Sequence, residues 1–300
     1  MSLANNEVLM KQEKKVKYTP KAANNKASVQ NIISYVILVI LSVLFVFPTL
    51  VVLMNSFKGK LYISEQPFVF VNSDTFVGLE NYVAGIQKTD FLAACGWSLF
   101  ITIGSTAAII LFTSMTAWYI TRVKSKVTTC LYYLFVFSMI VPFQMVMFTM
   151  SKVANMIHLD NPVGMIVLYL GFGAGLSVFM FSGFVKSVPI EIEEAAMIDG
   201  CTPIQTFFMI VFPLLKPIAV TITILNVMWI WNDYLLPYLV IGSNYKTIPI
   251  AVQYLRGGYG SIDMGAMMAL LVLAIIPIII FYLTCQKHII EGIAAGAVKG

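Results

Sequence analysis

Six long apolar stretches recur along this 300-residue chain and leave few folds open to it. A helix needs about 20 mainly apolar residues to cross roughly 30 Å of hydrocarbon, and each stretch has that length. Hydrophobic residues make up 59% of the chain and charged residues only 11%, so a water-soluble fold could not bury the apolar surface. The sequence predicts an all-α, polytopic membrane protein with six transmembrane helices, over residues 32–54, 97–119, 130–150, 162–185, 218–241 and 264–285.

The distribution of lysine and arginine predicts the orientation of these spans. With the N-terminus in the cytoplasm, the inner segments carry 13 of these residues and the outer segments carry 6, which agrees with the positive-inside rule. Both termini and the polar segment 186–217 are then cytoplasmic. We expect a disordered basic tail (1–30), a six-helix transmembrane domain (31–286) that includes segment 186–217, and a C-terminal tail (287–300).

The N-terminal region could be mistaken for a secretion signal or a nucleic-acid-binding arm. The first apolar stretch exceeds 20 residues and has no A-x-A-like cleavage site, so we interpret it as a retained span. Six lysines between Lys11 and Lys26 account for much of the net charge of +5. A juxtamembrane basic cluster of this kind suits anionic membrane lipid, and we expect no nucleic-acid partner.

Segment 186–217 begins with the pattern of a short helix. Pro189 suits a first helical turn, because the N–H that proline lacks has no partner there. Glu191, Glu193 and Glu194 follow, where carboxylates are favoured by the positive end of the helix dipole. Gly200 can adopt the left-handed conformation that commonly ends a helix.

A second short helix is predicted directly after Gly200. Thr202 can cap its N-terminus, Pro203 occupies the first helical position, and Gln205 stands at capping-box spacing from the threonine. Pro213 and Pro217 end this helix and start the next span. The segment therefore predicts two helices joined by a glycine hinge.

These two helices carry apolar side chains that neither can bury alone. Part of this surface can pack on the protein's own membrane helices, and part can enter a groove of another chain, as amphipathic helices do in helix-in-groove recognition. The side chains concerned are Ile190, Ala195, Met197, Ile198, Ile204, Phe207, Phe208 and Val211.

The segment also carries a family motif. Glu194-Ala195-Ala196, Gly200, Ile210 and Phe212-Pro213 resemble in sequence and spacing the EAA loop of permease subunits of bacterial ATP-binding-cassette importers, with Phe at 212 where the family has Leu. Asp199-Gly200, Trp231-Asn232-Asp233 and the closing residues 295–300 resemble the maltose-type second permease of the carbohydrate-uptake branch. The resemblance covers the chain from about residue 30 to the end.

The resemblance implies a type I importer permease fold in which segment 186–217 is a cytoplasmic coupling loop seated in a cleft of an ATPase. Glu194 would be a polar contact to the ATPase, Ala195 and Ala196 a close-approach surface, and Gly200 the turn of the backbone. The ATPase-coupling residues would be Glu193, Glu194, Ala195, Ala196, Asp199, Gly200, Pro203 and Pro213.

The implied function is that of one permease subunit in an ATP-driven carbohydrate importer of the bacterial cytoplasmic membrane. The implied partners are a second permease subunit, two ATPase subunits, an extracytoplasmic solute-binding protein, the carbohydrate and membrane lipid. ATP and Mg would be bound by the ATPase, and this chain would be no enzyme. Import of a non-sugar solute and ion-coupled secondary transport remain the alternatives.

Polar side chains within the predicted spans are candidates for the translocation pathway. Asp233 is the only acidic residue well inside a predicted span, where a charge is costly and usually faces a cavity or a partner. It could instead be hydrated near the interface, or hold neighbouring helices together. The candidates are Asn226, Trp229, Trp231, Asn232 and Asp233 in the fifth span, and Gln144 near Pro142 in the third.

No pattern indicates chemistry performed by this chain. The sequence has no G-x-x-x-x-G-K-[ST] loop, no HExxH pair and no G-x-S-x-G turn. Cys95, Cys130, Cys201 and Cys285 are isolated, without the spacing of a metal site or a disulfide framework. We therefore expect no catalytic residue and no metal.

Overall fold

The structure is a computed structural model that describes residues 29–242, 244–255 and 263–297, with side chains described over 31–242, 244–255 and 263–287. The chain divides into two compact units, residues 1–50 and 51–300, each of which is described by itself. The predicted tail 1–30 falls almost entirely outside the described residues. The described residues form helices and one isolated bridge between Lys58 and Phe76.

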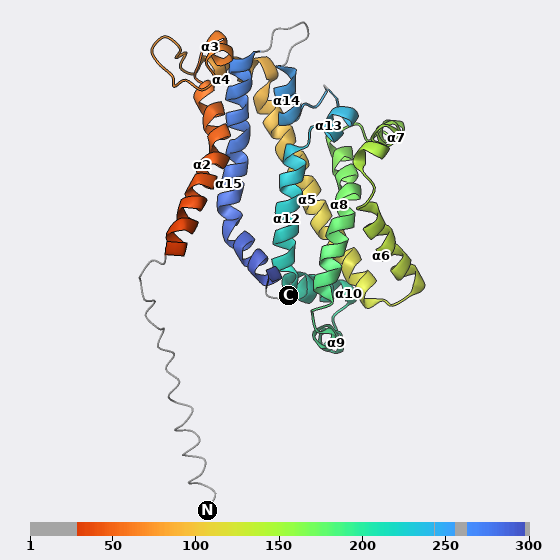
Figure 1. The fold of residues 1–300 in the computed structure, drawn as a ribbon. Coiled ribbons are helices and arrows are strands. Elements are labelled where there is room, and N and C mark those ends of the chain that lie inside the picture. Colours follow the sequence, from red (N-terminus) through yellow and green to blue (C-terminus); the bar gives the residue numbers. More distant parts are fainter. Residues whose placement is uncertain (1–28, 243, 256–262, 298–300) are drawn as a thin grey trace, which may run out of the picture. The chain divides into compact units, whose positions relative to one another are not determined.

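The helices follow one another along the whole described chain (Figure 1). They are α2 (Val29–Asn55), α3 (Lys60–Glu65), α4 (Glu80–Thr89), α5 (Phe91–Arg122), α6 (Lys126–Ser138), α7 (Phe143–Met156), α8 (Pro162–Val185), α9 (Ile190–Ile198), α10 (Pro203–Thr206), the π-helix η2 (Phe207–Val211), α11 (Phe212–Leu214), α12 (Lys216–Asn232), α13 (Leu235–Val240), α14 (Ile248–Tyr254) and α15 (Met264–Ala297).

Four of the predicted spans are continuous helices, and two are broken. Among the described residues, α2, α5, α8 and α15 each have the length and apolar character needed to cross a membrane. The predicted third span corresponds to the pair α6 and α7, bent by 107°. The predicted fifth span, 218–241, corresponds to segment 216–232, which is bent by 76° from the loop segment 203–214. The all-α, polytopic fold is confirmed, with up to six spans if each bent pair counts as one.

Proline explains where the predicted continuous spans are wrong. In an α-helix the proline ring clashes with the carbonyl four residues earlier and removes a hydrogen bond. Pro142 has this effect at Ser138, where α6 ends, so residues 130–150 are not one helix. Pro237 has it at Asp233, so the predicted span 218–241 stops as a helix at Asn232. Asp233 takes an extended conformation instead, at φ −74° and ψ 123°.

Side-chain caps explain where two of the helices begin. Ser125 forms a capping box with Thr128 at the start of α6. The Asn161 side chain accepts the N–H groups of Val163 and Gly164 at the start of α8, with Pro162 at the first helical position. The ends of the helices are thus set locally by residues that satisfy otherwise unpaired N–H groups.

In the first unit, α2 presents apolar side chains on all its faces. Every described side chain from Asn31 to Leu50 is exposed. A helix that is apolar all round is the form expected of a membrane span, because its backbone groups are satisfied internally and its side chains suit lipid.

In the second unit, α5 packs most extensively against α8. The buried face of α5 carries small polar residues at helical spacing, among them Ser98, Thr102, Ser105 and Thr113. Small residues let membrane helices approach closely. Gly175 allows α8 to approach α6 closely in this way, since a Cβ added at Gly175 would lie 2.8 Å from the Phe135 carbonyl oxygen.

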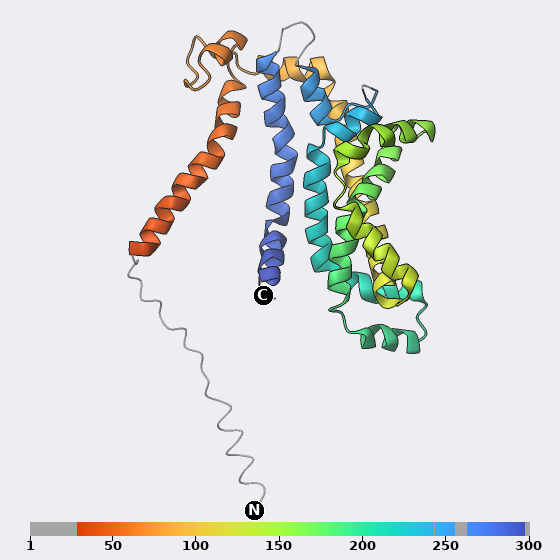
Figure 2. The same ribbon diagram turned by 45° about the vertical axis from the view of Figure 1, so that its right-hand side comes forward.

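The two ends of the second unit hold different elements. One end holds α9, α10 and the turn between α5 and α6, whereas α4, α13 and α14 lie at the other end (Figure 1). Turning the molecule shows α9 lying beyond the adjacent ends of α8 and α12 (Figure 2). The segment that contains the sequence motif is therefore a projection at one end of the helices.

The end that holds α4 is built around a buried lysine. Lys58 is 1% exposed, and its Nζ donates to the Gln66 carbonyl at 2.9 Å. Burial lowers the pKa of the Lys58 ammonium group. The Asn81 side chain donates to the carbonyls of Ser56 and Lys58, at 2.8 Å each, and so fixes α4 to the turn that follows Asn55. Segment 55–92, in which the sequence shows no motif, thus has defined structure.

Candidate functional site

The predicted hinge is confirmed in its details. Helix α9 ends at Ile198, and Gly200 adopts a left-handed conformation at φ +89°. The Thr202 hydroxyl accepts the Gln205 N–H at 3.3 Å, and the Gln205 side chain accepts the Thr202 N–H at 2.8 Å. Two helical segments therefore meet at a turn that glycine makes without strain.

The second helical segment is less regular than predicted. After the four residues of α10, the backbone widens into the π-helix η2. Pro213 lies two residues after η2, in α11, and its ring would clash with the Met209 carbonyl in a regular α-helix. A π-turn at this position gives the chain a local irregularity between the hinge and α12.

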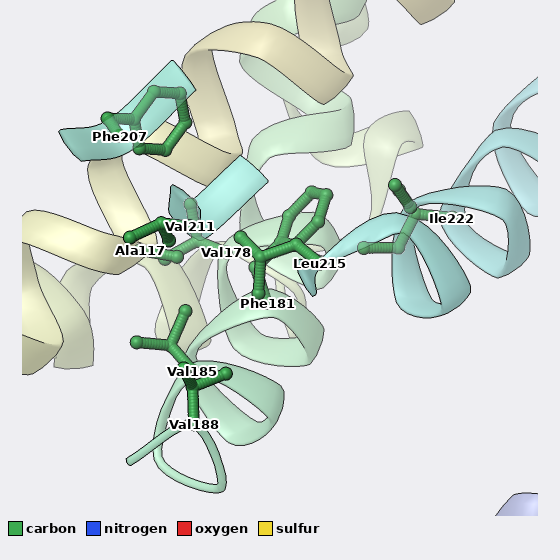
Figure 3. Close-up of a cluster of buried hydrophobic side chains, with 10 residues drawn as sticks. Ala117, Val178, Phe181, Val185, Val188, Phe207, Val211, Leu215 and Ile222 are labelled. Carbon is green, nitrogen blue, oxygen red and sulfur yellow. The ribbon is translucent and has the colours of Figure 1, made fainter. Parts of the chain in front are cut away.

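One face of this loop is packed against the membrane helices. Phe207 and Val211 are 1% and 0% exposed, and they lie in one cluster with Ala117 of α5 and Phe181 of α8 (Figure 3). Val188, Val178, Val185, Leu215 and Ile222 complete the labelled part of the cluster. The interpretation that part of the loop packs on the protein's own helices is correct for these residues.

The other face is exposed and largely apolar. Ile198 is 86% exposed and Ile204 is 66% exposed, on the two sides of the hinge. The exposed apolar set is Ile190, Ile192, Met197, Ile198, Ile204, Phe208 and Met209. Glu194, Ala195, Asp199, Gly200, Pro203 and Pro213 are exposed as well. We call this set of residues the exposed loop face.

Two residues of the predicted coupling set do not belong to the exposed loop face. Ala196 is 8% exposed and Glu193 is 2% exposed, because both point toward the membrane helices. The Glu193 carboxylate accepts hydrogen bonds from Trp118 Nε1 at 2.8 Å and from Arg122 Nη2 at 2.7 Å. Of Glu194, Ala195 and Ala196, which were expected to contact an ATPase, the first two are therefore exposed and the third is buried.

Trp118 and Arg122 were not among the predicted site residues. Arg122 Nε also donates to Glu193 Oε1 at 3.0 Å, and Arg122 Nη2 donates to the Val188 carbonyl at 2.8 Å. The available signal was an arginine and a glutamate in segments predicted on the same side of the membrane. Only the packing of α5 under the loop shows that they meet.

The predicted pathway residues separate into two groups. Asn226 and Trp231 are 5% and 6% exposed. The Asn226 amide donates to the Ile222 carbonyl at 2.9 Å, and Trp231 Nε1 donates to the Ala274 carbonyl at 3.3 Å. Trp229 and Asn232, by contrast, are exposed on α12, and Gln144 is exposed on α7.

Asp233 lies between these two groups and is half-buried. Its Oδ2 accepts the hydroxyl of Tyr169, a fully buried residue of α8, at 3.0 Å. The Tyr169 ring and the ring of the exposed Trp229 pack at right angles, with centroids 5.4 Å apart. The structure thus brings Asp233, Tyr169 and Trp229 together, although the sequence pointed only to the first and third.

A cavity of about 610 Å³ lies between α5, α12 and α15. Its lining is mainly apolar, with Trp231 and Pro277 among the larger side chains and Thr102, Thr106 and Thr223 as the polar ones. Of the predicted pathway residues, only Trp231 lines it.

Several membrane-spanning helices, together with a hinged loop that projects from one end, define a polytopic membrane protein. Residues 110–294 match the family described as binding-protein-dependent transport system inner membrane component. The chain belongs to this family and is a transport permease.

Two permease proteins of known name are similar in sequence to this chain over nearly its full length. The probable starch degradation products transport system permease protein AmyC of Thermoanaerobacterium thermosulfurigenes is 37% identical over 91% of this chain and 99% of its own length. The multiple sugar-binding transport system permease protein MsmG of Streptococcus mutans is 35% identical over 97% of this chain and 100% of its own length.

A solved structure shares the fold. A chain of a bacterial ABC transporter involved in the import of the acidic polysaccharide alginate superposes with a TM-score of 0.71, at 19% identity, covering 88% of this chain and 97% of that chain.

Proposed function

We propose that this permease subunit imports a sugar, using ATP hydrolysed by a separate ATPase that docks on the exposed loop face. Relatives AmyC and MsmG are named for starch degradation products and for multiple sugars, which supports a sugar as substrate. The observation that carries the docking proposal is the hinge at Gly200, which projects apolar side chains on both of its sides.

The loop face has the character of a helix-in-groove ligand. Ile198 and Ile204 provide apolar contact area, Ala195 allows close approach, and Glu194 offers a carboxylate to a basic partner surface. The charge distribution along the sequence supports a cytoplasmic position for this end of the protein, with both termini on the same side. ATP and Mg would then be bound by the partner.

We assign the opposite end to substrate entry. There an extracytoplasmic binding protein would deliver the sugar, and a second permease subunit would complete the passage. Trp229 and Asn232 are exposed on α12 and could offer a sugar an aromatic face and an amide. Asn226 and Trp231 are buried on the same helix, and their side-chain N–H groups donate to the backbone carbonyls of Ile222 and Ala274. Gln144 is a further exposed candidate on α7.

Reconstitution tests this proposal. The chain is placed in proteoliposomes with the second permease, ATPase and binding protein of its own organism, and uptake of labelled maltotriose, raffinose and histidine is measured. We expect uptake of at least one of the two sugars that requires both ATP and the binding protein. Preferential histidine uptake would contradict the sugar assignment. Uptake by this chain alone, driven by an ion gradient, would contradict ATP coupling.

A further inference from the structure

A single buried carboxylate holds helix α9 against the end of α5. Glu193 is 2% exposed and accepts three hydrogen bonds, one from Trp118 and two from Arg122, at 2.7–3.0 Å. Trp118 and Arg122 stand one helical turn apart on the last turns of α5. These three hydrogen bonds thus come from one helix end.

The Arg122 guanidinium contacts the loop at two points. Its Nε and Nη2 donate to the Glu193 carboxylate within α9, and Nη2 also donates to the Val188 carbonyl just before α9 begins. Two contacts at different places along the chain fix both the position and the direction of a short helix. A planar guanidinium can make both contacts at once, whereas a lysine ammonium on a flexible stem holds such a geometry poorly.

The same helix end also contacts the other side of the hinge. The Trp118 ring packs on Phe207 of η2, with ring centroids 5.4 Å apart. Phe207 is 1% exposed and follows directly after α10. Both sides of the Gly200 hinge are therefore attached to α5, one by charge and the other by apolar packing.

Helix α5 continues from this attachment to the opposite end of the second unit. It is one unbroken helix of 32 residues. The Ser98 hydroxyl accepts the Ile248 N–H at 2.8 Å, at the start of α14. From Ser98 to Arg122 the helix rises about 36 Å at about 1.5 Å per residue, which is comparable to the thickness of a bilayer.

We propose that Arg122, with Glu193 and Trp118, is the joint through which movement of the docked loop is transmitted to α5. This inference rests on the proposed docking of an ATPase on the exposed loop face. Arg122 is a positioning residue: it contacts neither ATP nor the sugar, and it keeps α9 and α5 moving as one body. Loosening the joint should let ATP be hydrolysed without moving the transmembrane helices.

The test compares sugar transport with ATP hydrolysis in the reconstituted full complex. The first variant is Arg122→Lys, which keeps the positive charge but not the planar guanidinium with its several N–H donors. The second is Glu193→Gln. The third is Trp118→Phe, which keeps an aromatic ring against Phe207 but removes the indole N–H. Lys124→Gln is the matched control, since Lys124 is an exposed basic residue just beyond the end of α5. The readout is the number of maltotriose or raffinose molecules taken up for each ATP hydrolysed, alongside co-purification of the ATPase.

We expect Arg122→Lys to retain ATPase binding and to lower the transport ratio about tenfold, the factor that corresponds to one charge-assisted hydrogen bond. Glu193→Gln and Trp118→Phe should lower the ratio in the same direction, and Lys124→Gln should leave it unchanged. A joint that merely supports the fold would reduce uptake and hydrolysis together, at constant ratio, and that result would overturn the inference.

The outcome for the unmodified chain separates this inference from the proposed function. If the wild-type complex transports sugar and the three variants take up as much sugar for each ATP hydrolysed, the role of Arg122, Glu193 and Trp118 as a joint is refuted. The proposal that an ATPase docks on the loop would then stand. If the ATPase does not associate with the wild-type chain at all, the proposed function fails and the joint fails with it. Should Arg122→Lys not assemble, Trp118→Phe decides, because it removes one hydrogen bond and no charge.

Discussion

Asp233 uses both of its carboxylate oxygens within the protein. Oδ1 accepts the N–H groups of Leu235 and Leu236, at 3.0 and 3.4 Å, and Oδ2 accepts the Tyr169 hydroxyl. The side chain thus starts α13 and joins the end of α12 to α8. These contacts support the alternative that Asp233 holds neighbouring helices together, in addition to any contact with a passing solute.

The pair Asp233 and Tyr169 should therefore contribute jointly to stability. We expect Asp233→Ala to lower the free energy of unfolding by about 1–3 kcal/mol, and Tyr169→Phe by about 0.5–1.5 kcal/mol, because each change removes a largely buried hydrogen bond. In the double variant the losses should be less than additive. Unfolding of the purified subunit measures this, with exposed Asn232→Ala as the control. Strict additivity would show that the pair is not coupled.

Lys88 and Asp263 form an ion pair between α4 and the start of α15. Burial alone would raise the pKa of the Asp263 carboxyl, but hydrogen bonds from Lys88 and the Ala266 N–H and the nearby positive charges outweigh it, and the pKa is lowered. A lowered pKa means that the charged form is stabilised by folding, so this contribution is complete above the ordinary aspartate pKa of about 4.

The contribution of this pair to the stability of the second unit should accordingly stay constant with pH near neutrality and fall as the pH drops through the lowered pKa of Asp263. Lys88→Gln should reduce the part of the acid sensitivity that Asp263 contributes, whereas Lys152→Gln, at an exposed lysine of α7, should not. Melting temperatures between pH 3 and pH 7 would measure this. Equal acid sensitivity in Lys88→Gln and the wild type would contradict the role of the pair.

Individual contacts of this kind were only partly predictable. Gly200 and the Thr202–Gln205 capping box could be read directly, because the residues that form them are neighbours in sequence. Arg122 and Glu193 are 71 residues apart, and Tyr169 and Asp233 are 64 apart. Pairs so distant depend on which helix faces pack together, and spacing in the sequence does not encode that.

At the scale of helices, prolines coincide with the breaks, but the presence of a proline does not by itself predict a break. Pro142 and Pro237 coincide with interrupted helices, whereas Pro48 and Pro277 lie inside the continuous helices α2 and α15. Neighbouring groups can satisfy the backbone that a proline leaves unpaired in a membrane helix, so proline alone does not decide. At Asp233 the side chain caps the next helix, which stabilises the break. Element type was therefore predictable, and continuity was not.

The hinge between α9 and α10 gives a test at this scale. Gly200 has φ +89°, and an added Cβ would meet nothing within 4 Å, so the backbone conformation is the whole constraint. Gly200→Val should cost about 1–2 kcal/mol locally and redirect α9. We expect normal insertion and reduced sugar uptake per ATP hydrolysed. Gly183→Ala, at an exposed glycine of α8 with equally open surroundings, is the control. Unchanged coupling in Gly200→Val would show that the direction of α9 is unimportant.

At the scale of the whole molecule, the apolar stretches are sufficient to predict a polytopic helical fold, and the loop motif is sufficient to predict the family. Both predictions rest on local sequence patterns. A span needs only length and hydrophobicity, and the hinge needs only Gly200 and the Thr202–Gln205 capping box. The cavity between α5, α12 and α15 could not be predicted, because three helices that are separate in sequence form it.

The central claim is that the exposed loop face docks an ATPase, and photo-cross-linking tests it most directly. Benzoylphenylalanine is placed in the full transporter at Ile198, which is 86% exposed on the loop, or at Leu61, which is 73% exposed on α3 at the opposite end. We expect light to cross-link the ATPase at position 198 and not at position 61. Cross-linking of the ATPase at position 61, or its absence from position 198 in an actively transporting complex, would contradict the account.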